Sequence, residues 1–65
     1  MPGSVILNNL KEKYKNEIAI HKTNINLFLA NPTGVADHIN FTETVEKELE
    51  AIARAKDLLE ALEQL

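Results

Sequence analysis

Asp37 and His38 are adjacent in the stretch NPTGVADHIN, residues 31 to 40, and their types could support chemistry. A carboxylate and an imidazole can share a metal ion or a proton. Adjacent loop residues rarely point the same way, however, and a catalytic site needs further groups that converge on a pocket. We therefore expect both side chains to bond loop backbone or helix-end amides, and we predict a protein that is not an enzyme and holds no cofactor or metal. A metal-dependent activity built from the Asp37 and His38 of several copies is the alternative.

The second histidine, His21, lies on the apolar face of a predicted helix. If the two halves of the chain pair in antiparallel fashion, His21 lies about three helical turns from the connection, because each turn takes 3.6 residues. It is then too far from His38 for the two to share a metal within one chain. We predict that His21 is a core or interface histidine with a hydrogen bond across the helices.

Other features argue against phosphate, nucleic-acid and membrane binding. Gly34 stands without the further glycines and the lysine of a phosphate-binding loop. The lysines of the first half alternate with acids and asparagines, and the second half is acidic, which would repel a phosphate backbone. Apolar runs are far shorter than the ~20 residues needed to cross a bilayer. We expect neither a nucleic-acid nor a membrane partner.

The elements that must position these residues are two amphipathic helices. In the first half, apolar positions recur at helical spacing through Leu7, Leu10, Tyr14, Ile18, His21, Ile25 and Phe28. In the second half the same spacing runs through Phe41, Val45, Leu49, Ile52, Ala55, Leu59 and Leu62. The pattern predicts a single all-α domain over residues 1–65, a two-helix antiparallel hairpin with helices at about 4–30 and 41–65 joined by a hinge at 31–40.

Local signals set these boundaries. Pro32 cannot continue a helix and disfavours helical geometry at Asn31, so the first helix should end near Ala30. Asn40, followed three residues later by Glu43, resembles a capping box and predicts the start of the second helix.

The small size of the chain makes self-association the central expectation. A 65-residue chain without cysteine has a marginal core and no disulfide to reinforce it. Ile6, Ile20 and Leu27 widen the first apolar face beyond what one neighbouring helix can cover. We predict a homo-oligomer, most simply a dimeric four-helix bundle, with the interface formed by Leu10, Tyr14, Ile18, His21, Ile25, Phe28, Val45, Leu49, Ile52, Leu59 and Leu62.

Charge is divided unequally between the two halves. Residues 1–30 carry a net charge of +2 and residues 31–65 carry −5, which together give the total of −3. Opposite charges of this kind suit a hairpin folded on itself or on a copy.

The segment from Leu29 to Leu62, LANPTGVADHINFTETVEKELEAIARAKDLLEAL, resembles short helical-hairpin proteins encoded by T4-like phages of marine bacteria. The shared features are the Asn-Pro-Thr-Gly turn, the acid–His pair and an acidic helix with a late Asp-Leu-Leu element. Ile39 and Asn40 depart from the pattern, which has a proline and an acidic cap there. The resemblance implies a structural or assembly protein of the host cytoplasm or the virion, with no assigned site residues. The alternative is a small adaptor or inhibitor that binds another phage or host protein through one helix face.

Overall fold

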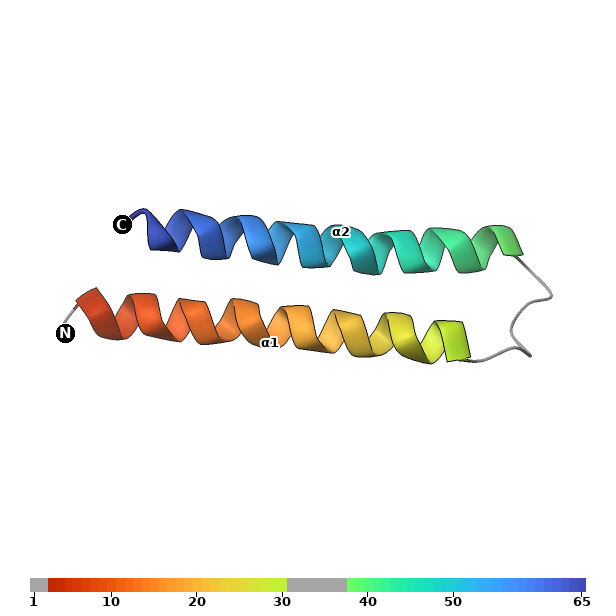
Figure 1. Cartoon of the computed structure of the whole chain (residues 1–65), viewed down its shortest axis with the longest axis horizontal. Helices are drawn as coiled ribbons and strands as arrows, with labels where there is room; N and C mark the ends of the chain where they lie inside the picture. Colours follow the sequence, from red (N-terminus) through yellow and green to blue (C-terminus); the bar gives the residue numbers. More distant parts are fainter. Residues whose placement is uncertain (1–2, 31–37) are drawn as a thin grey trace.

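The computed structural model describes the backbone of residues 3–30 and 38–65, and the side chains of residues 3–30 and 41–65. Over these ranges the chain forms two helices, α1 (Gly3–Ala30, 28 residues) and α2 (His38–Glu63, 26 residues). The helices run in opposite directions side by side, so that the start of α1 and the end of α2 lie together at what we call the open end (Figure 1). The predicted all-α hairpin is confirmed.

The helix boundaries follow the sequence signals in the first helix and depart from them in the second. α1 ends at Ala30, as Pro32 predicts. α2 begins at His38, so Asn40 lies inside the helix and the prediction of a capping box at that residue is wrong.

At its C-terminal end, α2 closes with a tightened turn. The backbone amides of Gln64 and Leu65 donate to the carbonyl oxygens of Ala61 and Leu62, each at 3.2 Å. Bonds between residues three apart are a common way to satisfy the last carbonyl groups of a helix. The helix was predicted to end at about residue 65, and it ends two residues earlier, at Glu63.

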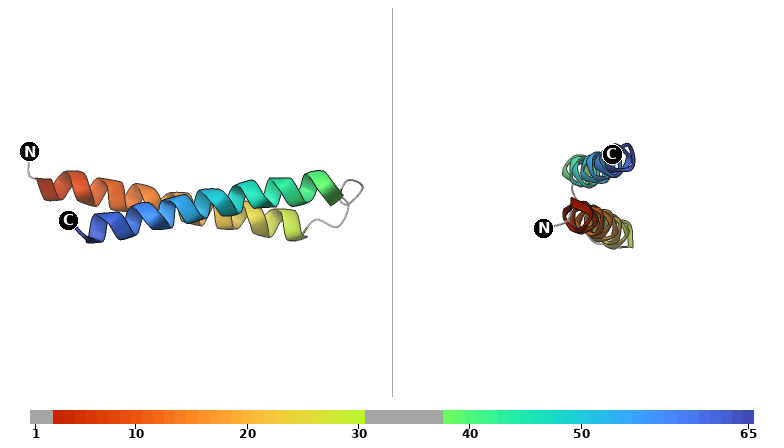
Figure 2. Two further views of the ribbon diagram at one scale, coloured as in Figure 1. Left: turned by 90° about the horizontal axis from the view of Figure 1, so that it is seen from above. Right: turned by 90° about the vertical axis from the view of Figure 1, so that its left-hand side faces the viewer.

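The molecule is a rod with little interior. Its principal extents are 51 × 15 × 13 Å, and its radius of gyration is 15.4 Å. A compact domain of this length would have a radius of gyration of about 11 Å. Two helices crossing at a shallow angle, as Figure 2 shows, touch along one line, so each helix keeps most of its circumference in solvent.

Two contacts define how the helices are aligned along that line. His21 bonds to Glu48, and the ring of Phe28 packs edge-on against the ring of Phe41, with the ring centroids 5.4 Å apart. From the first contact to the second, the position moves seven residues forward on α1 and seven residues back on α2. Seven residues are about two turns of each helix. The same step places Tyr14 level with Ala55, and Leu7 level with Leu62. We call these residues the seam: Leu7, Tyr14, His21 and Phe28 on α1 with Phe41, Glu48, Ala55 and Leu62 on α2.

Burial is concentrated near the middle of α2. Among the residues whose side chains are described, Ile52 (7% exposed) and Ala55 (0%) are the apolar residues that are fully buried. A large residue in one helix facing a small one in the other lets helices approach closely. In the seam, Tyr14 lies level with Ala55 and so provides such a pairing of a large and a small residue. Tyr14 is half-buried, which agrees with this placement.

The apolar face predicted for the second helix differs from the observed one at Leu49. The residue is 58% exposed, while its neighbour Glu48 occupies the seam position and is half-buried. The seam repeats every seven residues, which after Phe41 selects residue 48 and not residue 49. Leu49 therefore contributes little to the contact between α1 and α2.

Candidate functional site

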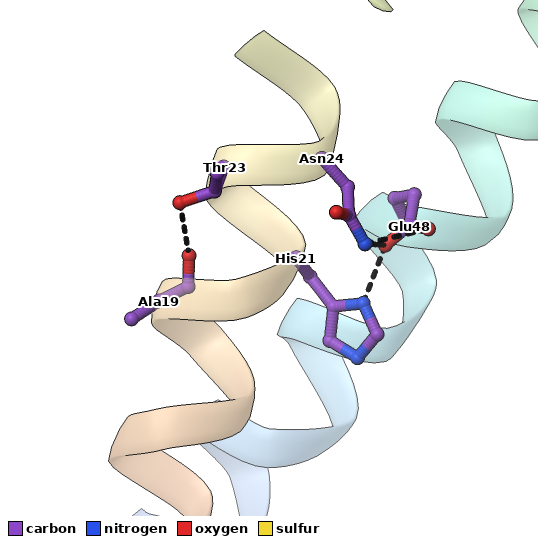
Figure 3. Close-up of polar contacts among 5 residues, drawn as sticks. All are labelled: Ala19, His21, Thr23, Asn24 and Glu48. Carbon is purple, nitrogen blue, oxygen red and sulfur yellow. Dashed lines mark hydrogen bonds and ion pairs between the residues drawn. The ribbon is translucent and has the colours of Figure 1, made fainter. Parts of the chain in front are cut away.

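A polar cluster interrupts the seam near its centre. Figure 3 shows His21 and Asn24 pointing from α1 toward the carboxylate of Glu48 on α2. The Nδ1 atom of His21 bonds to Oε2 of Glu48, and the Nδ2 atom of Asn24 donates to both carboxylate oxygens at 3.3 Å. This arrangement confirms the prediction that His21 makes a hydrogen bond across the helices.

The spacing of the cluster on α1 explains why two of its side chains reach one carboxylate. His21 and Asn24 are three residues apart, so they lie on adjacent turns of the same helix face. On α2, Glu48 lies level with His21 and bonds to both side chains. A carboxylate can accept several hydrogen bonds at once, which lets it satisfy both donors.

These contacts change the acidity of the carboxylate. The hydrogen bond from His21 lowers the pKa of Glu48 below its ordinary value of 4.5; partial desolvation opposes this, and the bond from Asn24 adds to the lowering. The side chains of His21 and Glu48 keep 28% and 20% of their surface exposed, so water still reaches the pair. The cluster therefore keeps Glu48 ionised over a wider pH range than an isolated glutamate.

Chemically, the cluster is suited to alignment of the helices. Over the described residues, no three histidine, cysteine, aspartate or glutamate side chains gather closely enough to hold a metal ion. A polar group in an apolar seam is costly unless it meets its partner, and polar seam residues are known to fix helix register. A slip of one turn would separate His21 and Asn24 from Glu48.

Besides the polar cluster, the hairpin has large hydrophobic side chains that remain exposed to solvent. The large hydrophobic residues that remain exposed occur on both helices and are Val5, Ile6, Leu7, Ile20, Leu27, Leu29, Leu49 and Leu65. Leu27 and Leu29 keep 63% and 71% of their surface in contact with solvent. These eight side chains are the large hydrophobic residues, among those described, that another molecule could cover.

The predicted interface residues are mostly used within the hairpin itself. Ile52 is fully buried between the helices, and a further nine are half-buried: Leu10, Tyr14, Ile18, His21, Ile25, Phe28, Val45, Leu59 and Leu62. Leu49 alone of the predicted set is exposed. Their role in association stays a prediction. The large hydrophobic residues with the most exposed surface are Leu65, Leu29, Leu27 and Leu49, of which Leu49 alone belongs to the predicted set.

An apolar groove lies at the open end of the hairpin. It has a volume of about 290 Å³ and is lined by Ser4, Leu7, Asn8 and Lys11 of α1 with Leu59, Leu62 and Glu63 of α2. Leucine side chains from both helices supply its apolar lining, while Lys11 and Glu63 bring opposite charges to it. No residue of the polar cluster borders this groove.

The predictions for Asp37 and His38 concern residues that the structure describes only in part or not at all. Asp37 lies outside the described residues, and His38 is described only as the first residue of α2, so their predicted roles stay predictions. Neither described helix has a stretch long and apolar enough to span a bilayer.

Comparison of the chain with protein families, with curated proteins and with solved structures found no match. The features of the described residues that bear on function are the polar cluster, the exposed apolar residues and the groove.

Proposed function

We propose that this chain is a non-enzymatic helical-hairpin module that works by associating with copies of itself, as a structural or assembly protein. The observation that carries the proposal is the exposure of eight large hydrophobic residues on a rod that fully buries only two apolar residues among those whose side chains are described. Complete burial of a fully exposed side chain of this type is worth on the order of 1.5–3 kcal/mol. These eight residues keep 37–86% of their surface exposed, so each would gain a corresponding share on burial.

The exposed area is of the size that a partner would cover. The accessible surface of the hairpin is 5115 Å². A compact protein of 7.3 kDa would expose about 4,200 Å². The excess of about 900 Å² is close to the ~800 Å² that each partner contributes to a standard protein interface. One further copy per chain is therefore sufficient to restore the surface of a compact protein.

The resemblance of residues 29–62 to phage helical-hairpin proteins supports a place in a phage particle or its assembly. In that setting a short module without cysteine can reach stability through repetition, since subunit association stabilises the folded state by mass action. Such a component should occur in purified virions in a fixed ratio to other particle proteins, and its absence from virions would contradict this part of the proposal.

The test of self-association is the mass of the purified chain in solution. Light scattering across the micromolar range should give a dimer or a larger species with a helical circular dichroism spectrum. A well-folded monomer of 7.3 kDa over the whole range would overturn the proposal. Aspartate at Ile52 is unsuitable as the disrupting variant, because Ile52 is buried between α1 and α2 and its loss would unfold the hairpin. Leu49→Asp is better suited, since Leu49 makes little contact within the chain.

A further inference from the structure

Glu48 bears on which helices can pair through their seam residues. It is the one charged residue that α2 contributes to the seam, where the others are Phe41, Ala55 and Leu62. If two copies placed their α2 helices seam against seam, each Glu48 would face one of these apolar residues or the Glu48 of the other copy. None of these side chains donates a hydrogen bond, since an ionised carboxylate only accepts. The hydrogen bonds that Glu48 makes to α1 would therefore have no replacement in such a seam.

The cations of α2 lie outside the seam. Lys47, Arg54 and Lys56 are all exposed. Thr44, which is half-buried one turn before Glu48, already has an interaction of its own. The side chain of Glu48 keeps only 20% of its surface exposed, so water compensates little for a lost hydrogen bond. A pair of α2 helices would bury two such carboxylates, one from each copy, at a cost in free energy.

Pairing of α1 with a second α1 is restricted less. The donors His21 and Asn24 would again lose Glu48, but α1 has a carboxylate of its own near them. Glu17 is half-buried and lies one turn before His21, so a second α1 can present it to the same donors. The restriction that the polar cluster imposes on helix pairing therefore falls on α2.

Apolar packing by itself would not exclude a second α2. The residues beside the α2 seam include Val45, Ile52 and Leu59, which can pack against the same residues of another copy. Seven acids and three cations give α2 a net charge of −4, which opposes such a pair, but exposed charges are screened by salt. The partly buried Glu48 is screened much less. The discrimination that persists at high salt therefore comes from Glu48.

We propose that Glu48 selects the partner of α2: it accepts α1, whose His21 and Asn24 satisfy the carboxylate, and excludes the α2 helix of a second copy. Copies that associate then keep every α2 paired with an α1. They join as closed hairpins through surfaces outside the seam, or they exchange α2 helices, which preserves the same cluster across two chains. The choice of partner helix is independent of whether the wild-type chain self-associates, because it operates within one hairpin as well as between copies.

The first test moves the two sides of the cluster into separate chains. His21→Glu sets two carboxylates level in the seam, and Glu48→Lys leaves the donors of α1 level with a further donor. When the two variant chains are mixed, exchange of their α2 helices pairs the introduced glutamate with the introduced lysine, and His21 with Glu48. Native mass spectrometry from concentrated ammonium acetate should give a ratio of the mixed dimer to the dimers of either variant that is about tenfold above the statistical value.

The matched control makes the same two charge changes outside the seam. Thr23→Glu and Glu46→Lys lie two residues from His21 and Glu48, and both positions are exposed. Mixing these variants brings together the same net charges and leaves the cluster intact. The mixed dimer should then form at no more than about twice the statistical ratio, since exposed charge pairs contribute little at high salt.

The second test removes the restriction and identifies the helices that pair. Tyr14 is the one tyrosine of the chain and lies level with Ala55 in the seam, so a nuclear Overhauser effect from the Ala55 methyl group to a tyrosine ring marks an α1–α2 pair. Glu48→Leu makes the α2 seam wholly apolar. At millimolar concentrations, comparable with the effective concentration of two helices joined by a short connection, a second set of signals without this contact should appear and grow with concentration. Glu46→Leu adds the same side chain outside the seam and should keep one set.

The results that would overturn the selection by Glu48 are specific. One is an equal ratio of mixed dimers for the seam variants and the control variants. Another is a Glu48→Leu chain that keeps only the Tyr14 contact at every concentration. Seam variants that do not fold alone but fold when mixed would support the selection, because only the exchanged pair restores the cluster. The mass of the wild-type chain alone tests self-association separately.

Discussion

Replacing Ile52 by alanine is the most direct test of which residues hold the hairpin closed. Ile52 keeps only 7% of its surface exposed, so the change removes three carbon atoms from between the helices. At about 0.8 kcal/mol per buried methylene group, and allowing for the better helix propensity of alanine, the free energy of unfolding should fall by about 2 kcal/mol. A single core of this size supplies about 3–5 kcal/mol, so the loss should be conspicuous.

Leu49→Ala provides the matched control. It also removes three carbon atoms, from a residue three positions away on the same helix, but Leu49 is 58% exposed. Its loss should cost about 1 kcal/mol or less within the isolated hairpin, because most of the side chain is already in water. If Leu49 contacts a second copy, the variant will lose further stability at concentrations where the chain is associated.

The assay is urea unfolding followed by circular dichroism at several protein concentrations. At concentrations low enough for the midpoint to become independent of concentration, Ile52→Ala should have the clearly lower midpoint with an unchanged slope. Equal losses for the two variants, or a larger loss for Leu49→Ala under these conditions, would mean that the seam lies elsewhere on α2 and that the register deduced from the His21 and Phe28 contacts is wrong.

Three further perturbations test the seam at separate points. The hydrogen bond from His21 lowers the pKa of Glu48 in the folded state, so the contribution of Glu48 to stability is present above its ordinary pKa of 4.5 and is lost as the pH falls through the lowered pKa. Urea midpoints should therefore drop as the pH falls below 4.5, and Glu48→Gln should reduce that drop. Ala55→Leu adds volume at a position with no exposed surface, level with Tyr14, and should destabilise the hairpin by about 1–3 kcal/mol in thermal unfolding; unchanged or increased stability would show that the helices do not approach closely there. Phe28→Ala removes the edge-on aromatic contact to α2 and should cost about 2 kcal/mol, less than for a fully buried ring because Phe28 is half-buried; a loss below that of Leu49→Ala would contradict a closed seam at that end.

The polar cluster fixes the register of the two helices, and the register in turn affects the surface that is available for association. A seam made only of aliphatic residues would tolerate several alignments, whereas His21 and Asn24 meet their acceptor in one register. That register determines which residues form the groove at the open end. A variant that removes the cluster and fills the seam with apolar residues should raise hairpin stability or leave it unchanged, yet change the mass or cooperativity of the assembly.

Much of the fold could be predicted from local features of the chain. The 3.6-residue spacing of apolar residues identified both helices, and Pro32 placed the end of α1 at Ala30. The cross-helix bond of His21 could be predicted because a histidine on an apolar face needs a polar partner. The start of α2 was placed three residues too late, because the capping pattern formed by Asn40 and Glu43 favoured a start at Phe41, whereas the helix begins at His38.

The identity of the acceptor, and of the residues left exposed, was decided by the tertiary structure. The apolar arc of the second helix is wide, so its buried centre could be placed on either side of residue 48. Because Leu49 is hydrophobic and Glu48 is charged, the sequence favoured Leu49 as the buried residue. The seam selects residues at intervals of seven on two helices at once, so the level of Phe28 with Phe41 and of His21 with Glu48 turns Glu48 inward and Leu49 outward. The sequence by itself determined two amphipathic helices and their ends to within a turn. Only the pairing of the helices determined which part of each apolar arc is buried and which faces solvent, because that choice depends on residues distant in the chain meeting at the same level.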